Sequence, residues 1–218
     1  MPAATRWWWI RHAPVPDGGR IYGQRDLACD CSDREAFAGL AAEVPAEAVW
    51  VTSHLVRTTQ TARAIHAADP GKFAGVELLA LPELAEQHLG DWQGLDRQAF
   101  YAARGIGTHM LWLAEADERA PGGESFADLM RRVAPAIDRL NAAHRGRDIV
   151  AVTHGGTIRA ALGLALGIPP RAALAFSTEN CSLTRLDHLP GAGGAGVWRV
   201  VAVNRRLARA APAGSAAI

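Results

Sequence analysis

Short, uninterrupted apolar runs recur along the chain, and between them apolar residues return at helical spacing. A run of this kind is typical of a strand that is buried on both faces, as in a parallel sheet covered by helices. Three such strands are predicted, starting at Trp7, Ala48 and Asp148. The segments 181–189 and 197–204 flank a Gly-rich loop, and this pattern indicates an antiparallel hairpin near the end of the chain.

Helices are predicted between these strands. The helix at 32–44 has Ser32 or Asp33 as its N-cap, and a later helix opens on Ser125 with a capping-box-like Asp128. Strand and helix therefore alternate, which predicts an α/β fold: a three-layer αβα sandwich around a mostly parallel central sheet with an antiparallel edge. The full set of expected helices covers residues 32–44, 54–68, 96–118, 125–144 and 157–167.

Length and composition favour one domain. The chain has 218 residues, of which 49% are apolar, enough to bury a sizeable core. We expect a single domain over residues 1–205 and a flexible, low-complexity tail over 206–218. The formal net charge is +1, so no electrostatic footprint predicts binding to nucleic acid or to an anionic membrane.

Two further features bear on the compartment. No apolar stretch reaches the roughly 20 residues that a bilayer span requires. The three cysteines, Cys29, Cys31 and Cys181, are odd in number and lack paired C-x-x-C spacing. This speaks against a disulfide framework and against a structural zinc site, and it indicates a reducing, cytoplasmic location.

Polar side chains with phosphate chemistry follow the three predicted strands. Arg11 and His12 follow the first strand, Arg57 lies one turn into the helix after the second, and His154 ends the third. Ligands of open α/β sheets bind at the carboxyl ends of the strands, so neighbouring strands would bring these groups together. Guanidinium groups bind phosphate in bidentate fashion, and a neutral imidazole is a competent nucleophile toward phosphorus. The sequence therefore predicts a phosphoryl pocket.

Five motifs in a fixed order resemble the histidine phosphatase superfamily, which includes the cofactor-dependent phosphoglycerate mutases. The resemblance covers residues 7 to 182, and one position departs from it: Ala13 stands where the family has glycine. Since alanine is the smallest such change, we expect activity to survive it. The five motifs are IRHA, SHLVRTTQTA from Ser53, LAEQHLGDWQG from Leu84, GGES from Gly122, and VTHGG, which contains His154.

The resemblance implies a role for each of these polar groups. His12 would attack the phosphoryl group and carry it as phosphohistidine before water regenerates the enzyme. Arg11, Arg57 and His154 would bind the phosphoryl oxygens and stabilise the charge of the transition state. The resemblance implies no metal and no cofactor.

The same resemblance makes Glu86 the acid that protonates the leaving oxygen and then activates water. Glu83 and Asp91 lie close to it in the sequence and remain alternative acids. The remaining expected substrate contacts come from the loop after the first strand and from the residue after His154: Tyr22, Gly23, Gln24 and Gly155.

The opening loop GRIYGQRD, from Gly19, is similar to that of the α-ribazole-5′-phosphate phosphatases of cobalamin biosynthesis. The expected function is hydrolysis of a small-molecule phosphate monoester, with α-ribazole-5′-phosphate as a candidate substrate. A broad-specificity sugar or nucleotide phosphatase and a phosphoglycerate mutase are alternatives. A catalytically inactive phosphate-binding or interaction module is an alternative of another class. The final hairpin also offers an edge strand for a homodimer.

Overall fold

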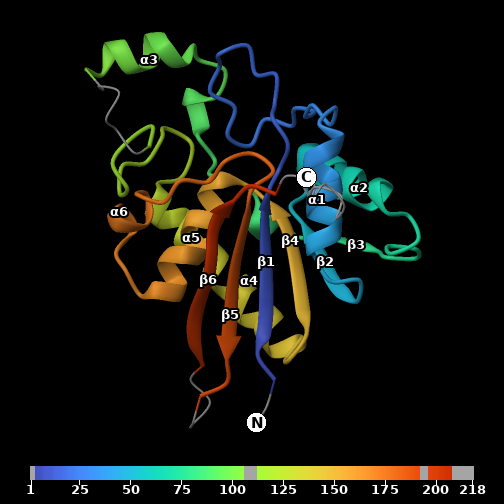
Figure 1. Cartoon of the computed structure of the whole chain (residues 1–218). Helices are drawn as coiled ribbons and strands as arrows, with labels where there is room; N and C mark the ends of the chain where they lie inside the picture. The colour runs from blue at the N-terminus through green and yellow to red at the C-terminus, as the bar shows by residue number, and fades with distance from the viewer. Residues whose placement is uncertain (1–2, 106–111, 192–195, 208–218) are drawn as a thin grey trace, which may run out of the picture.

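The computed structural model describes residues 3–105, 112–191 and 196–207 (Figure 1). Along the chain its elements are β1 (Thr5–Arg11), α1 (Arg34–Glu43), β2 (Ala48–Thr52), α2 (Val56–Ala68), β3 (Leu78–Ala80), the 3₁₀ helices η1 (Pro82–Leu84) and η2 (Gly90–Trp92), α3 (Arg97–Ala103), α4 (Phe126–Ala143), β4 (Asp148–Thr153), α5 (Gly155–Leu166), α6 (Pro170–Ala173), β5 (Leu183–Leu189) and β6 (Val197–Arg205).

The strands form one mixed sheet in the order β3-β2-β4-β1-β5-β6. Strands β3, β2, β4 and β1 run parallel to one another. Strand β5 is antiparallel to β1, and β6 is antiparallel to β5. The predicted α/β fold with a mostly parallel sheet and an antiparallel edge is confirmed, and β4 lies between β1 and β2.

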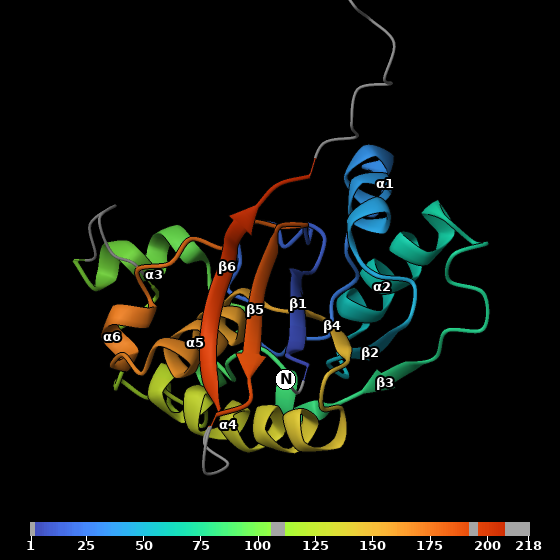
Figure 2. The same cartoon turned by 60° about the horizontal axis from the view of Figure 1, so that its bottom comes forward.

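Helices cover both faces of the sheet (Figures 1 and 2). Successive strand side chains point to opposite faces, so the tryptophan run of β1 supplies both cores. Trp8 and Ile10 pack with α1 and α2 on one face. Trp7 and Trp9 pack with α4 and α5 on the other, and their rings stack with centroids 4.7 Å apart. This burial on both sides fixes the strand that ends in the candidate nucleophile.

The helix-start signals act as predicted. The side chain of Asp33 accepts a hydrogen bond from the amide of Ala36 at the start of α1. Ser125 and Asp128 form a reciprocal capping box at the start of α4. Such caps satisfy amide groups that have no partner within the helix. None of the helices in the described part of the chain is long and apolar enough to cross a membrane.

The predicted helix over 96–118 is wrong in its length. Helix α3 ends at Ala103, and residues 112–118 contain no helix. The amide of Gly105 donates to the carbonyl of Ala102 with the glycine at φ +60°, a left-handed conformation that ends helices. Residues 106–111 of this prediction lie outside the described residues.

The chain leaves the sheet through β6, which forms one edge. Val197 and Val201 on this strand are 61% and 47% exposed. An exposed apolar edge offers a pairing surface, and a homodimer through it stays a prediction. Beyond β6, Leu207 packs against the core that contains α1 and α2. Residues 208–218 of the predicted tail lie outside the described residues.

Candidate active site

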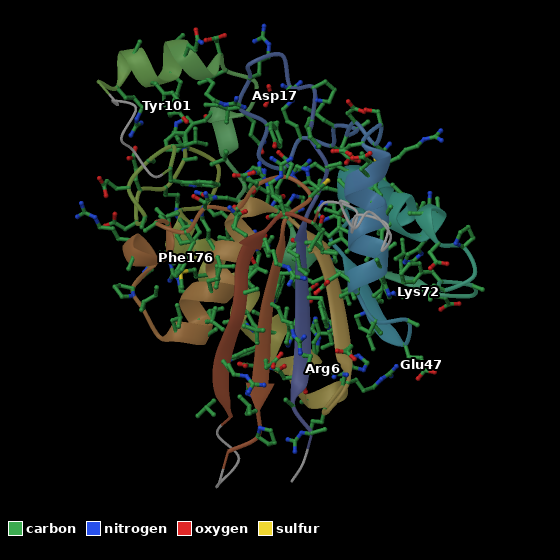
Figure 3. All side chains as sticks on the ribbon, viewed as in Figure 1. Arg6, Asp17, Glu47, Lys72, Tyr101 and Phe176 are labelled. Atoms are coloured by element: carbon green, nitrogen blue, oxygen red, sulfur yellow. The ribbon has the colours of Figure 1, made fainter. Side chains whose placement is uncertain are left out.

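The candidate side chains converge at the carboxyl ends of β1, β2 and β4, as the strand pattern predicts. Arg11 pairs in register with Thr153, so His12 and His154 follow neighbouring strands side by side. The amide of His12 donates to the carbonyl of Thr153 at 2.8 Å, and the two imidazole centroids are 5.2 Å apart. Figure 3 shows the labelled side chain of Asp17 above this end of the sheet.

His12 is held as a neutral imidazole. Its Nδ1 lies 2.7 Å from the carbonyl oxygen of Ala13. Because a carbonyl can only accept, the hydrogen-bond network assigns the proton to Nδ1 and leaves a lone pair on Nε2. Burial lowers the pKa of His12 well below its ordinary value, and the charges of Arg57 and Arg11 lower it further. The unprotonated Nε2 is therefore the ring nitrogen with a lone pair available.

His154 presents an unpartnered nitrogen at the same place. Its side chain is fully buried, and its Nε2 lies 2.8 Å from Oγ of Ser53. Its Nδ1 finds no hydrogen-bond partner among the described residues. Burial lowers the pKa of His154 well below its ordinary value, followed by the charges of Arg57 and His12. Since an unpaired buried polar atom is costly, Nδ1 is placed for an atom of a bound ligand.

The two guanidiniums are held by backbone carbonyls rather than by carboxylates. Arg57 is fully buried and donates to the carbonyls of Arg25 at 2.8 Å and Gly23 at 2.6 Å. Arg11 donates to the carbonyl of Thr178 at 2.6 Å. The Nε atoms of both arginines lack partners within the described structure. Both side chains therefore keep their positive charge for a ligand, although burial lowers the pKa of Arg57.

Glu86 lies beside these groups with 9% of its surface exposed. Its Oε2 accepts a hydrogen bond from the amide of Gly156 at the start of α5 (3.2 Å), and its Oε1 accepts from the amide of Gln87 (2.9 Å). The carboxylate is thus fixed by two backbone donors, close to the cationic groups.

The alternative acids lie elsewhere. Glu83 pairs with Arg139 at 2.7 Å, and Asp91 is exposed. Neither of them lines the cavity described below, whereas Glu86 does.

A cavity of about 440 Å³ opens beside the site, and the buried side chains of His12, Arg57 and His154 are not among its lining residues. Its rim includes Tyr22, whose ring centroid lies 5.1 Å from Cζ of Arg57 and 6.4 Å from the ring of His12. Gln24 is not among the lining residues: its side-chain amide donates to the carbonyl of Glu86 at 2.8 Å. The predicted site residues that do line the cavity are Arg11, Tyr22, Gly23, Glu86 and Gly155.

Ala13 is fully buried and belongs to the core on the side of α1 and α2. Its amide donates to Oγ1 of Thr61 at 2.8 Å, and it does not line the cavity. The described residues include no group of three or more His, Cys, Asp or Glu side chains placed to hold a metal ion.

Two arginines at the site were not predicted from the sequence. Arg132, from α4, reaches across to the carbonyls of Glu83 (2.8 Å) and Glu86 (3.2 Å), and so holds the segment that carries the carboxylate. Arg159, from α5, lines the cavity itself. Helical spacing from Gly155 could have indicated Arg159, because residues four apart share a helix face. No local signal indicates Arg132.

Comparison with known proteins agrees with this geometry. Residues 7–204 match the family described as the histidine phosphatase superfamily, branch 1. A glucosyl-3-phosphoglycerate phosphatase of Mycolicibacterium vanbaalenii is 35% identical over 162 residues, which cover 70% of this chain and 69% of that protein. A probable phosphoglycerate mutase of Yersinia enterocolitica is 30% identical and covers 78% of this chain and 77% of its own length.

Solved structures of phosphatases are also similar to this chain. A mycobacterial glucosyl-3-phosphoglycerate phosphatase superposes with a TM-score of 0.77 at 28% identity, covering 95% of this chain and 100% of that one. An α-ribazole phosphatase from Shigella flexneri has a TM-score of 0.72 at 22% identity over 95% and 100% of the two chains, which shows a shared fold. The chain therefore belongs to the histidine phosphatase superfamily and is a phosphoric monoester hydrolase.

Proposed function

We propose that the protein hydrolyses a small-molecule phosphate monoester through a phosphohistidine at His12. Its Nε2 attacks phosphorus in line, a P–N bond forms, and the P–O bond to the leaving alcohol breaks. Arg11, Arg57 and Nδ1 of His154 bind the non-bridging phosphoryl oxygens and stabilise the charge of the transition state.

Glu86 completes the proton balance. Its carboxylic acid gives a proton to the leaving oxygen, and the resulting carboxylate then takes a proton from the water that attacks the phosphohistidine. The P–N bond breaks, inorganic phosphate leaves, and the neutral imidazole of His12 is restored. General acid catalysis of this kind contributes about 10²- to 10⁴-fold. The amides of Gly156 and Gln87 support this role because they fix both carboxylate oxygens.

One observation carries the proposal: two buried neutral imidazoles face two guanidiniums that no carboxylate neutralises within the described residues. The unpartnered Nδ1 of His154 and Nε of Arg57 are left for the oxygens of a phosphoryl group. An interaction module would have no need to keep such costly groups unpaired.

Two substrates are candidates. The loop from Gly19 favours α-ribazole-5′-phosphate, an intermediate of cobalamin biosynthesis. The 35% identical relative named as a glucosyl-3-phosphoglycerate phosphatase favours that sugar acid phosphate instead. The three cysteines are free, with the sulfurs of Cys29 and Cys31 3.6 Å apart, and this supports action in a reducing compartment such as the cytoplasm.

The test measures phosphate release from these two esters, from 3-phosphoglycerate and from 4-nitrophenyl phosphate. The protein is compared with His12→Ala and with His54→Ala, which alters an exposed histidine as a control. We expect His12→Ala to lose about 10³-fold or more. Acid-labile phosphate should accumulate on the unaltered protein and on His54→Ala but not on His12→Ala. Full activity of His12→Ala would refute the phosphohistidine. Isomerisation of 3-phosphoglycerate without phosphate release would indicate a mutase, and inertness toward every ester would indicate a binding module.

A further inference from the structure

Arg159 places an additional cation in the wall of the active-site cavity. Side chains of an α-helix lean toward its N-terminus, and Arg159 accordingly lies over Gly155, one turn earlier in α5. An added Cβ at Gly155 would lie 3.3 Å from Nη1 of Arg159 and 3.5 Å from Nε of Arg11. The glycine thus separates two guanidiniums that line the same cavity.

The structure fixes Arg159 without neutralising it. Its Nε donates to the carbonyl of Phe176 at 2.6 Å, and its Cζ lies 4.8 Å from the ring centroid of Trp112. No carboxylate lies within ion-pair distance of Arg159 in the described part of the chain. Burial lowers the pKa of Arg159 to about 10; the charge of Glu86 opposes this shift and that of Arg11 adds to it.

Arg97, another arginine of the same cavity, differs from Arg159 in being paired with a carboxylate. Arg97 also lines the cavity, but its guanidinium pairs with Asp17 at 2.5 Å and donates to the carbonyl of Arg20 at 2.8 Å. Its charge is therefore already paired with a carboxylate, and its Nη2 makes both of these contacts. Arg159 is the member of this pair that is left to meet a charged group of the substrate.

The free donors of Arg159 indicate which group it meets. Since Nε is occupied, Nη1 and Nη2 remain, and two parallel N–H groups match the two oxygens of a carboxylate. Arg11 is already committed to the phosphoryl group in the proposed function. Because Nη1 of Arg159 and Nε of Arg11 lie 3.3 Å and 3.5 Å from the same point beside Gly155, the carboxylate and the phosphoryl group must be close together in the substrate.

We propose that Arg159 binds a carboxylate on the leaving group, so that the preferred substrates are phosphate esters of short hydroxy acids, free or extended at a second hydroxyl. This inference rests on the proposed phosphatase function and adds the substrate class. It favours a glycerate-type ester over α-ribazole-5′-phosphate, which carries no carboxylate.

The experiment compares kcat/KM for 3-phosphoglycerate and for glycerol 1-phosphate, which replaces the carboxylate by a hydroxymethyl group. A charge-assisted bidentate pair is expected to give the unaltered protein a preference of about 10- to 100-fold for 3-phosphoglycerate. In Arg159→Met this ratio collapses toward one, mainly through KM. Arg97→Met, the matched control, retains the ratio.

The other outcomes separate the two proposals. If 4-nitrophenyl phosphate is hydrolysed but the ratio is near one, or if Arg159→Met lowers both esters equally, the carboxylate site is refuted and the phosphatase stands. If no ester is hydrolysed, the proposed function itself fails. A larger Arg159-dependent preference for 1,3-propanediol bisphosphate would overturn the carboxylate in favour of a second phosphate.

A conservative variant tests the same contact if Arg159→Met misfolds. If Arg159→Met does not melt cooperatively, Arg159→Lys keeps the charge but loses the planar pair of donors. We expect the ratio to fall several-fold in this variant. An unchanged ratio would refute the bidentate contact.

Discussion

Gly156 is the residue at which the smallest possible side chain should disable the acid. Its amide donates to Oε2 of Glu86, and its α-carbon faces the same carboxylate. In Gly156→Ala the new methyl would meet Oε1 of Glu86 far inside 3.0 Å, a separation that real Cβ atoms essentially never show. The methyl would also lie 3.0 Å from Cδ2 of Leu129, so packing against the core keeps it from shifting away from Glu86.

The size of the effect follows from this clash. The carboxylate must move by roughly 1 Å, and a misplacement of that size costs about 100-fold in rate. The helix itself accepts alanine, since glycine in a helix interior is less stable than alanine by about 0.5–1 kcal/mol. We therefore expect Gly156→Ala to melt close to the unaltered protein while it loses about 100-fold on an alkyl ester such as glycerol 1-phosphate.

The assay uses the leaving group to identify the step. 4-Nitrophenolate leaves with little help from an acid, so Gly156→Ala should lose less than about tenfold on 4-nitrophenyl phosphate. The double variant Gly156→Ala/Glu86→Gln should be no slower than Glu86→Gln alone, because both changes remove the same group. Activity of Gly156→Ala within threefold of the unaltered protein on the alkyl ester would show that the added methyl does not displace Glu86, and additive losses in the double variant would show that the two changes act on different groups.

Three further predictions concern the groups around this acid. Ser53→Ala removes the partner of Nε2 of His154, and we expect the phosphorylation rate at His12 to fall about 10- to 100-fold, measured by rapid quench. Below about pH 6.5 the unfolded chain protonates His12 and His154 while burial holds the pKa values of the folded chain down, so stability is lost as the pH falls. The free energy of unfolding should drop by about 1.4 kcal/mol per histidine at one unit below that pH, measured in denaturant, and a flat profile would contradict it. Arg132→Met frees the backbone beneath Glu86 and should lower kcat on alkyl esters more than it raises KM, a split that steady-state kinetics would detect.

The sequence pattern predicts the site well because its chemistry is local to strand ends. His12 follows a strand that is apolar on both faces, and His154 follows another, so the alternation of strand and helix was enough to bring them to one edge. In the same way, Ser53 directly follows β2 and Arg57 lies in the first turn of α2, so this motif spans the connection from strand to helix. What the pattern leaves open is the strand order, since several orders would keep each strand buried.

Side chains that reach across elements could not be predicted in the same way. Arg132 and Arg159 act through long side chains whose targets lie on other segments, and a helical pattern records only the face on which they sit. The overlong helix at 96–118 fails for a related reason. The apolar residues of this segment pack in a small separate cluster around Phe100. Helix α3 ends near Gly105, so Leu113 and Ala114 join that cluster from non-helical chain.

The position of β4 between β1 and β2 has a consequence for synthesis on the ribosome. Strand β1 pairs with β4 and β5, and β2 pairs with β3 and β4, so β1 has no sheet partner until Asp148 and the residues after it have been made. Until then the run from Trp7 to Trp9 is unpaired and apolar, a state that favours misassociation. Arg11, His12 and Arg57 are therefore encoded early but assembled late, and a nascent chain that stops before β4 holds His12 on a strand without a sheet.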